Sequence, residues 1–137
     1  MNNYNYNYYM NRNNSYNSQQ ENLYSPTEGF IKGNMFSNLY NEYKNYKAKD
    51  IIVRSEQEKK LLEIQKISFA AHDLNLYLDT HPADQSMFML LQDYLRKKEN
   101  LVREYEMEFG PLTVSGVMNS NNFNWVSTRW PWEVRDV

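Results

Sequence analysis

The sequence predicts a mainly α-helical protein built on an antiparallel helical hairpin. Two stretches of about 25 residues place apolar side chains three and four positions apart, which is the spacing of one helix face. Between them, the short segment Leu78 to Ala83 contains the helix-breaking Pro82. Helices joined by so short a connection lie antiparallel. We expect a disordered Asn/Tyr-rich arm before the hairpin and an irregular aromatic tail after it.

Composition limits the classes of function that the chain can serve. It has 137 residues, a net charge of -2 and no cysteine. Thiolate metal sites and cysteine nucleophiles are therefore excluded, and the near-neutral charge argues against a nucleic-acid partner. No apolar run approaches the roughly 18 residues of a membrane span, and the N-terminus lacks the apolar core of a signal peptide. We expect synthesis in the cytoplasm and no membrane span.

Residues 1–23 form the arm, which is dominated by asparagine and tyrosine. It offers almost no aliphatic surface to offset a backbone ordering cost of about 1–2 kcal/mol per residue, so disorder is expected. One interpretation is a tolerated tail. The other is a self-associating arm whose tyrosines stack or are cross-linked by oxidation. A single-stranded nucleic-acid arm would need a cationic groove, whereas Arg12 is the one basic residue before Glu21.

Residues 24–54 form a docking segment and a linker. Ser25, Pro26 and Glu28 form a helix start with proline near the first helical position. The apolar residues that follow cannot form a core alone. Either they pack on the hairpin or they dock on another protein, as an anchor-bearing helix does in a groove. The candidate partner-binding residues here are Phe30, Phe36 and Tyr40.

The first hairpin helix is predicted to begin after Ser55, which forms a capping-box pattern with Glu58. Its main apolar stripe consists of Leu61, Ile64, Ile67, Ala71, Leu74 and Leu78. Further apolar residues widen this stripe, which predicts more than one neighbour for the helix.

The second helix is predicted to begin after Pro82 and to end at Gly110-Pro111, because glycine accepts a positive φ and proline cannot continue a helix. Its stripe consists of Met87, Leu91, Tyr94, Leu101, Tyr105 and Phe109. Two helices alone would leave much apolar surface in water. We expect either self-association into a homo-oligomeric bundle or a docked third element.

Residues in the turn are expected to end the first helix and to cap the second. Pro82 disfavours helical geometry at His81, so the first helix should end by about Thr80. Pro82 also suits the opening of the second helix, with Thr80 or His81 near the cap. Asp79 and Asp84 are placed to accept hydrogen bonds from free amides at that helix start.

Histidines and carboxylates near the turn raise the question of chemistry. His72 and His81 lie nine positions apart, which is not the i,i+3 or i,i+4 spacing of metal ligands on one helix. We therefore expect a capped turn with no metal, no cofactor and no catalytic residue. The alternative that stays open is a metal-dependent enzyme or metal-binding protein that uses both histidines and nearby carboxylates. Glu104, Glu106 and Glu108 suit a solvated face.

The tail holds all three tryptophans, Trp125, Trp130 and Trp132, with Pro131 between the last two. Tryptophan dominates interface energetics because it combines a large apolar area with a hydrogen-bond donor. Either the tail folds back on the hairpin or it presents an aromatic anchor to a partner. These four residues are the further candidates for partner binding.

Several of these motifs, taken in order, resemble the CotJB family of spore coat proteins. The resemblance runs from about Glu56 to Glu133, with Phe109 where tyrosine is expected. It is carried by Leu76-Tyr77-Leu78-Asp79-Thr80-His81-Pro82, Asp84, Tyr94, Tyr105-Glu106, Phe109-Gly110-Pro111-Leu112 and Trp130-Pro131-Trp132-Glu133.

The segment Ser25 to Tyr46 is also similar to the C-terminal end of CotJA, a small coat protein. Together the two resemblances imply a CotJA-like docking segment fused ahead of a CotJB-like hairpin. They imply a structural component of the inner spore coat that assembles with CotJA and with CotJC, which is similar to manganese catalases. No catalytic residue carries over from the family, so any metal chemistry would belong to the CotJC-like partner.

Overall fold

The computed structural model describes residues 22–39, 44–47, 49–119 and 121–123. Residues 1–21 of the predicted arm lie outside this part, as do four of the candidate binding residues in the tail and one in the region 24–54. Those five are Tyr40, Trp125, Trp130, Pro131 and Trp132.

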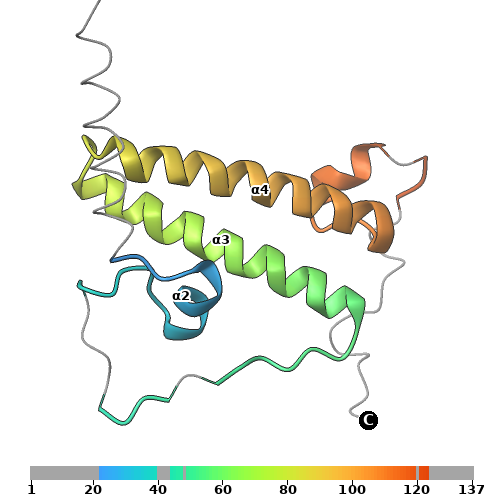
Figure 1. The fold of residues 1–137 in the computed structure, drawn as a ribbon. Helices are drawn as coiled ribbons and strands as arrows, with labels where there is room; N and C mark the ends of the chain where they lie inside the picture. Colours follow the sequence, from blue (N-terminus) through green and yellow to red (C-terminus); the bar gives the residue numbers. More distant parts are fainter. Residues whose placement is uncertain (1–21, 40–43, 48, 120, 124–137) are drawn as a thin grey trace, which may run out of the picture.

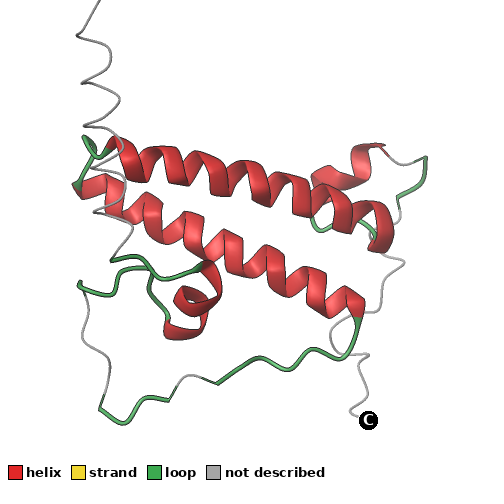
Figure 2. Ribbon diagram, in the orientation of Figure 1, coloured by secondary structure: helices red, strands yellow, loops and turns green. Residues whose placement is uncertain are grey.

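Two long helices lie side by side as an antiparallel hairpin (Figure 1). They are α3, Glu56–Thr80, and α4, Gln85–Phe109, each of 25 residues. Helices of this length extend for about 37 Å. Within the described residues, helices account for most of the regular structure and no extended strand forms (Figure 2). The predicted mainly α fold is confirmed, and so are the ends of the first helix at Thr80 and the second at Phe109.

The open end of the hairpin is closed by contacts between the first turns of α3 and the last turns of α4. Gln57 Nε2 donates to Tyr105 Oη at 3.0 Å, and Lys60 forms an ion pair with Glu108.

At the start of α3, the hydroxyl oxygen of Ser55 accepts from the Glu58 amide at 3.1 Å. The Glu58 carboxylate accepts from the Arg54 amide, one residue before the cap. Only one half of the capping box expected at Ser55 therefore forms.

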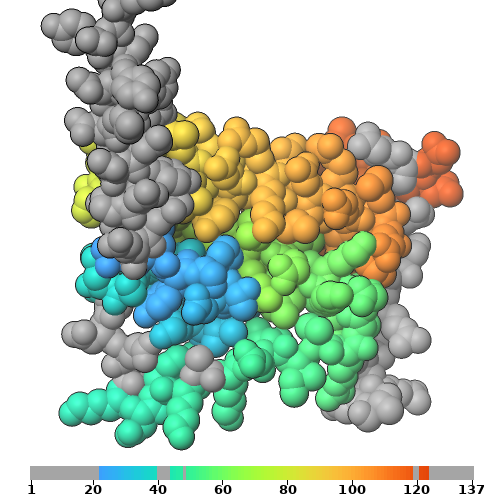
Figure 3. All heavy atoms as spheres, in the orientation of Figure 1, coloured from blue at the N-terminus to red at the C-terminus, as the bar shows by residue number. Residues whose placement is uncertain are grey.

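A third helix, α2, Pro26–Lys32, packs on α3 and is preceded by a complete capping box between Ser25 and Glu28. The residues on either side of α2 close it into a compact unit. Tyr24 N donates to the Met35 carbonyl and Ser37 N to the Asn22 carbonyl, both at 2.8 Å. We call residues 22–39 the docking segment. Figure 3 shows it seated against α3.

The core lies between α3, α4 and the docking segment, so the third element expected beside the hairpin is α2 with its flanks. Met35, Leu74 and Met87 are its largest fully buried side chains. Around them the cluster contains Phe36, Ala70, Ala71 and Leu91. A Cβ on Gly29 would lie 2.4 Å from Met35 Sδ, so only glycine lets α2 approach Met35 this closely.

The sequence predicted an irregular chain after α4, but part of this stretch is regular. Gly110 has the expected positive φ of 101°, and a 3₁₀ helix, η1, Val114–Asn119, follows. Glu106 organises this exit, because its carboxylate accepts from the Leu112 amide at 2.9 Å. A Cβ on Gly116 would lie 2.7 Å from Glu106 Oε1, so η1 packs closely on that carboxylate. Glu106 is therefore not on a solvated face, and that expectation was wrong.

Candidate partner-binding site

The turn of the hairpin is built around Asp84 and not around Pro82. Helix α4 begins at Gln85 with Asp84 as its N-cap, and the Asp84 carboxylate accepts from the amides of Ser86 and Met87, both at 3.1 Å. The expectation that Pro82 opens this helix, with Thr80 or His81 as cap, is wrong. Aspartate is a far better N-cap than histidine, because its side chain accepts hydrogen bonds from the free amides of the first turn.

The other turn residues close α3 or face water. Thr80 is the last helical residue, and its hydroxyl donates to the Tyr77 carbonyl at 3.0 Å. Asp79, His81 and Pro82 are exposed. Asp79 lies in the last turn of α3 and so does not serve as a cap for α4. At the far end of α4, Gly110 and Pro111 are half-buried beside η1.

Three stacked rings connect the docking segment to the turn. Phe36 is buried and stacks on Tyr77, with ring centroids 4.7 Å apart. Tyr77 stacks in turn on His81 at 4.2 Å, with the two rings nearly parallel. Tyr77 Oη donates to the Asp84 carboxylate at 3.2 Å. A partner that contacts the exposed His81 would therefore touch a column of rings that reaches the core.

The ionisation of Asp84 and Tyr77 follows from this arrangement. Partial burial acts to raise the pKa of Asp84, but hydrogen bonds from Ser86, Met87 and Tyr77 outweigh it and hold the pKa of that carboxyl below its usual value. Burial, with the neighbouring Asp84 carboxylate, raises the pKa of Tyr77. At neutral pH the turn therefore contains a charged carboxylate that accepts from a neutral phenol.

We predict that Asp84→Asn lowers the free energy of unfolding near neutral pH by about 1 kcal/mol, because asparagine caps the helix but offers no charged acceptor. A carboxyl with a depressed folded-state pKa stabilises the fold above its unfolded pKa, and this stabilisation is lost as pH falls through the folded value. The difference between the two proteins should thus shrink below about pH 4. Urea unfolding at several pH values measures it.

The matched control for this prediction is Asp79→Asn, which removes an exposed carboxylate five positions earlier. It should change the free energy of unfolding near neutral pH by less than about 0.5 kcal/mol, because this carboxylate caps no helix. A constant gap between the Asp84→Asn protein and the unmodified chain from neutral to acid pH would contradict the assigned role.

The face of α3 that receives the docking segment combines apolar contacts with one buried hydrogen bond. We call its residues the docking face: Phe69, Ala70, Asp73, Leu74 and Tyr77. The rings of Phe30 and Phe69 pack edge to face with their centroids 5.9 Å apart. The Met35 amide donates to Asp73 Oδ2 at 2.7 Å. The structure thus places Phe30 and Phe36, candidates for binding another protein, on the chain's own hairpin.

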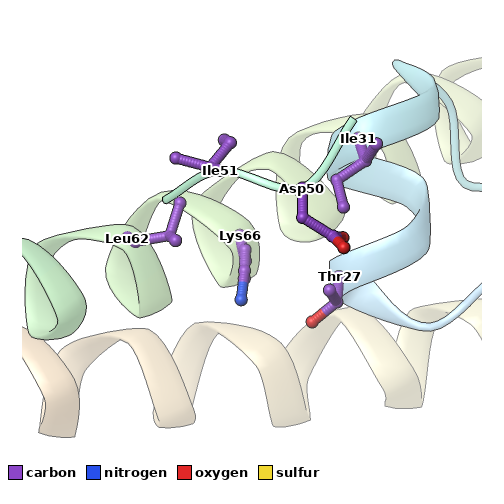
Figure 4. Close-up of a pocket in the computed structure, with 6 residues that line it drawn as sticks. All are labelled: Thr27, Ile31, Asp50, Ile51, Leu62 and Lys66. Carbon is purple, nitrogen blue, oxygen red and sulfur yellow. The ribbon is translucent and has the colours of Figure 1, made fainter. Parts of the chain in front are cut away.

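A small cavity of about 240 Å³ lies where the linker passes between α2 and α3. Figure 4 shows Ile51 near Leu62, and Asp50 beside Ile31 and Thr27 of α2. Lys66, the remaining lining residue, already pairs with Glu63 at 2.8 Å. The lysine that lines this cavity is therefore already paired.

Large apolar side chains are exposed on the hairpin near the turn. Leu76 is exposed in the last turns of α3, and Phe88 and Met89 are exposed in the first turn of α4. Leu95 continues this exposure seven positions after Phe88, two helical turns further along α4. Large apolar side chains exposed on neighbouring helical turns are candidates for contact with another protein. Of these four residues, the apolar spacing predicts only Phe88 and Leu95 as part of a broadened core stripe.

The histidines considered for metal binding lie apart along the hairpin. His72 is exposed midway along α3, and His81 is exposed at the turn, with its Nδ1 at 2.9 Å from Thr80 Oγ1. Among the described residues no group of three or more His, Cys, Asp or Glu side chains is placed to hold a metal ion.

None of the described helices has the length and apolar character needed to cross a bilayer.

Comparison with known proteins gives one match. The family model described as CotJB protein matches residues 58–133, more than half of the chain. This range includes α4, η1, nearly all of α3 and the tryptophan-rich tail. No curated protein and no solved structure matches the chain.

Proposed function

The chain belongs to the CotJB family of spore coat proteins, and on this premise we propose that it is a non-enzymatic structural component of the inner coat layer. It would be made in the cytoplasm of the sporulating cell and then join the coat with CotJA-like and CotJC-like partners. The observation that supports the proposal is the family match, which covers the hairpin and the tail together.

We propose that the exposed apolar residues near the turn and the tryptophan-rich tail form the contact with the CotJC-like partner. Leu76 and Phe88 flank the turn at the same level of the hairpin, and both are about half exposed. Their apolar area is available without unfolding any helix. Tryptophans add the large anchor side chains that dominate interface energies.

The test is retention of a co-expressed CotJC-like protein by this chain. We expect Trp130→Ala with Trp132→Ala to weaken retention about tenfold or more, since interface tryptophans are common hot spots. Far-UV circular dichroism should show unchanged helix content. A pull-down from sporulating cells, with the bound proteins identified, checks the partner itself.

The matched control truncates two exposed apolar residues outside this surface, Ile52→Ala with Met107→Ala. Its retention should equal that of the unmodified chain. Equal retention by the tryptophan double variant would count against the tail as the partner contact. Recovery of no coat protein in the pull-down would count against the proposed function as a whole.

A further inference from the structure

The docking segment is a self-contained unit. Its capping box, its positive-φ Gly33 and the hydrogen bonds from Tyr24 and Ser37 all lie within residues 22–39. These bonds satisfy backbone groups locally, so the segment does not need the rest of the chain to pair them. It can therefore leave and dock again without breaking the hydrogen bonds of α3 or α4.

The interface between segment and hairpin has the form of a peptide bound to a receptor. Met35 is fully buried, Phe36 nearly so, and the Met35 amide donates to Asp73 at 2.7 Å. Buried anchor side chains with one directed hydrogen bond are how short helical peptides are recognised. Nothing in these contacts requires that segment and hairpin belong to the same chain.

The tether between them is long. Residues 40–54 join the docking segment to α3, and the described residues from 44 to 52 are exposed. In Figure 1 the described residues of this tether run below α3 to the first turn of that helix, and Tyr46 Oη donates to the Ile31 carbonyl of α2 on the way. Fifteen extended residues reach about 50 Å, more than the length of the hairpin itself. The segment can thus reach the docking face of a neighbouring molecule.

We infer that the docking segment also binds in trans, on the docking face of a second copy of this chain, and so links copies together. The same contacts form whether the segment docks within its own chain or on a second copy. Exchange between chains therefore costs little beyond the loss of the high effective concentration that the tether provides. A tether of about fifteen residues gives an effective concentration in the millimolar range. Copies would therefore link when they are packed at a similar concentration, as in a solid protein layer.

The test uses two variants in which the docking segment cannot bind the docking face of its own chain. The full chain with Met35→Asp has a segment that cannot dock, because its carboxylate would be buried, but its docking face is free. The full chain with Ala70→Asp has a blocked face and a free segment, since Ala70 is fully buried in the cluster that also contains Met35 and Phe36. Each variant alone should remain monomeric in sedimentation analysis.

An equimolar mixture of the two variants should form a one-to-one heterodimer, because a free segment then meets a free face. Mixing either variant with a Met107→Asp chain, in which an exposed side chain is changed, should give at least tenfold less heterodimer. If Ala70→Asp lowers helix content, Asp73→Arg replaces it as the blocked face. That change lies at the acceptor of the Met35 amide.

Monomers alone in the mixture at about 0.1 mM, well below the tether's effective concentration, would overturn the inference. So would capture of a separate CotJA-like protein by the Met35→Asp chain without any heterodimer, which would assign the face to a different partner. The mixture contains no other coat protein. Its failure is therefore distinct from failure of the function proposed above.

Discussion

Replacement of Leu74 by alanine is expected to lower the free energy of unfolding by about 2–5 kcal/mol. Leu74 is 0% exposed and belongs to the cluster shared by α3, α4 and the docking segment. Truncation removes methyl groups from a site that three elements enclose. None of these elements can move inward without disturbing the others, so the cavity stays largely unfilled and the loss should lie toward the upper part of that range.

Leu76→Ala is the matched control, because Leu76 lies two positions later in the same helix and is 51% exposed. The change in helix propensity is the same for both replacements, so the difference between them isolates burial. We expect the control to change stability by less than about 1 kcal/mol. Urea unfolding followed by circular dichroism measures both, and equal losses would contradict the assigned core.

The parts of the fold that the sequence predicted are those determined by local chemistry. The spacing of apolar residues gave both long helices, and Pro82 and Gly110 marked where each must stop. Pro26 marked the first position of α2 in the same way. These signals work because a cap or a proline acts within one helical turn of itself.

The cap of α4 shows where local signals compete. Pro82 and Asp84 each suit a helix start, and they lie two residues apart. Proline only presets a backbone angle, whereas the Asp84 carboxylate accepts two amide hydrogen bonds and one from the Ser86 hydroxyl. Bonds to a charged acceptor outweigh a favourable φ. The sequence already placed Asp84 as an acceptor for free amides at this helix start but placed the cap at Thr80 or His81. A ranking of side-chain capping strength before proline preference would have placed the cap at Asp84 as well.

The structural roles of two carboxylates could not be identified from local patterns. Asp73 is, by sequence, one of the carboxylates near the two histidines, yet it accepts from an amide 38 positions earlier in the chain. Glu106 accepts from a residue beyond the helix end and lies against η1. Both roles depend on how separate elements pack. The same is true of the docking segment, for which the sequence left open whether it packs on its own hairpin or binds another protein.

Met35→Ala is expected to act differently from Leu74→Ala, although Met35 is also 0% exposed. The cost of the cavity is again about 2–5 kcal/mol, but a docked segment can avoid it by leaving the hairpin. Global stability therefore falls by no more than the free energy of docking. The full effect should instead appear as local opening, which is a property of weakly attached units.

Hydrogen exchange at the amide of residue 35, whose bond to Asp73 of α3 forms only when the segment is docked, measures this opening. A loss of 2 kcal/mol corresponds to about 30-fold faster exchange, while amides in the middle of α3 should change far less. Met107→Ala is the control, because that methionine is 76% exposed. Uniform acceleration throughout α3 and the segment would show that they open as one unit. In that case the segment could not exchange between chains without unfolding the hairpin, so this measurement also tests the link between copies.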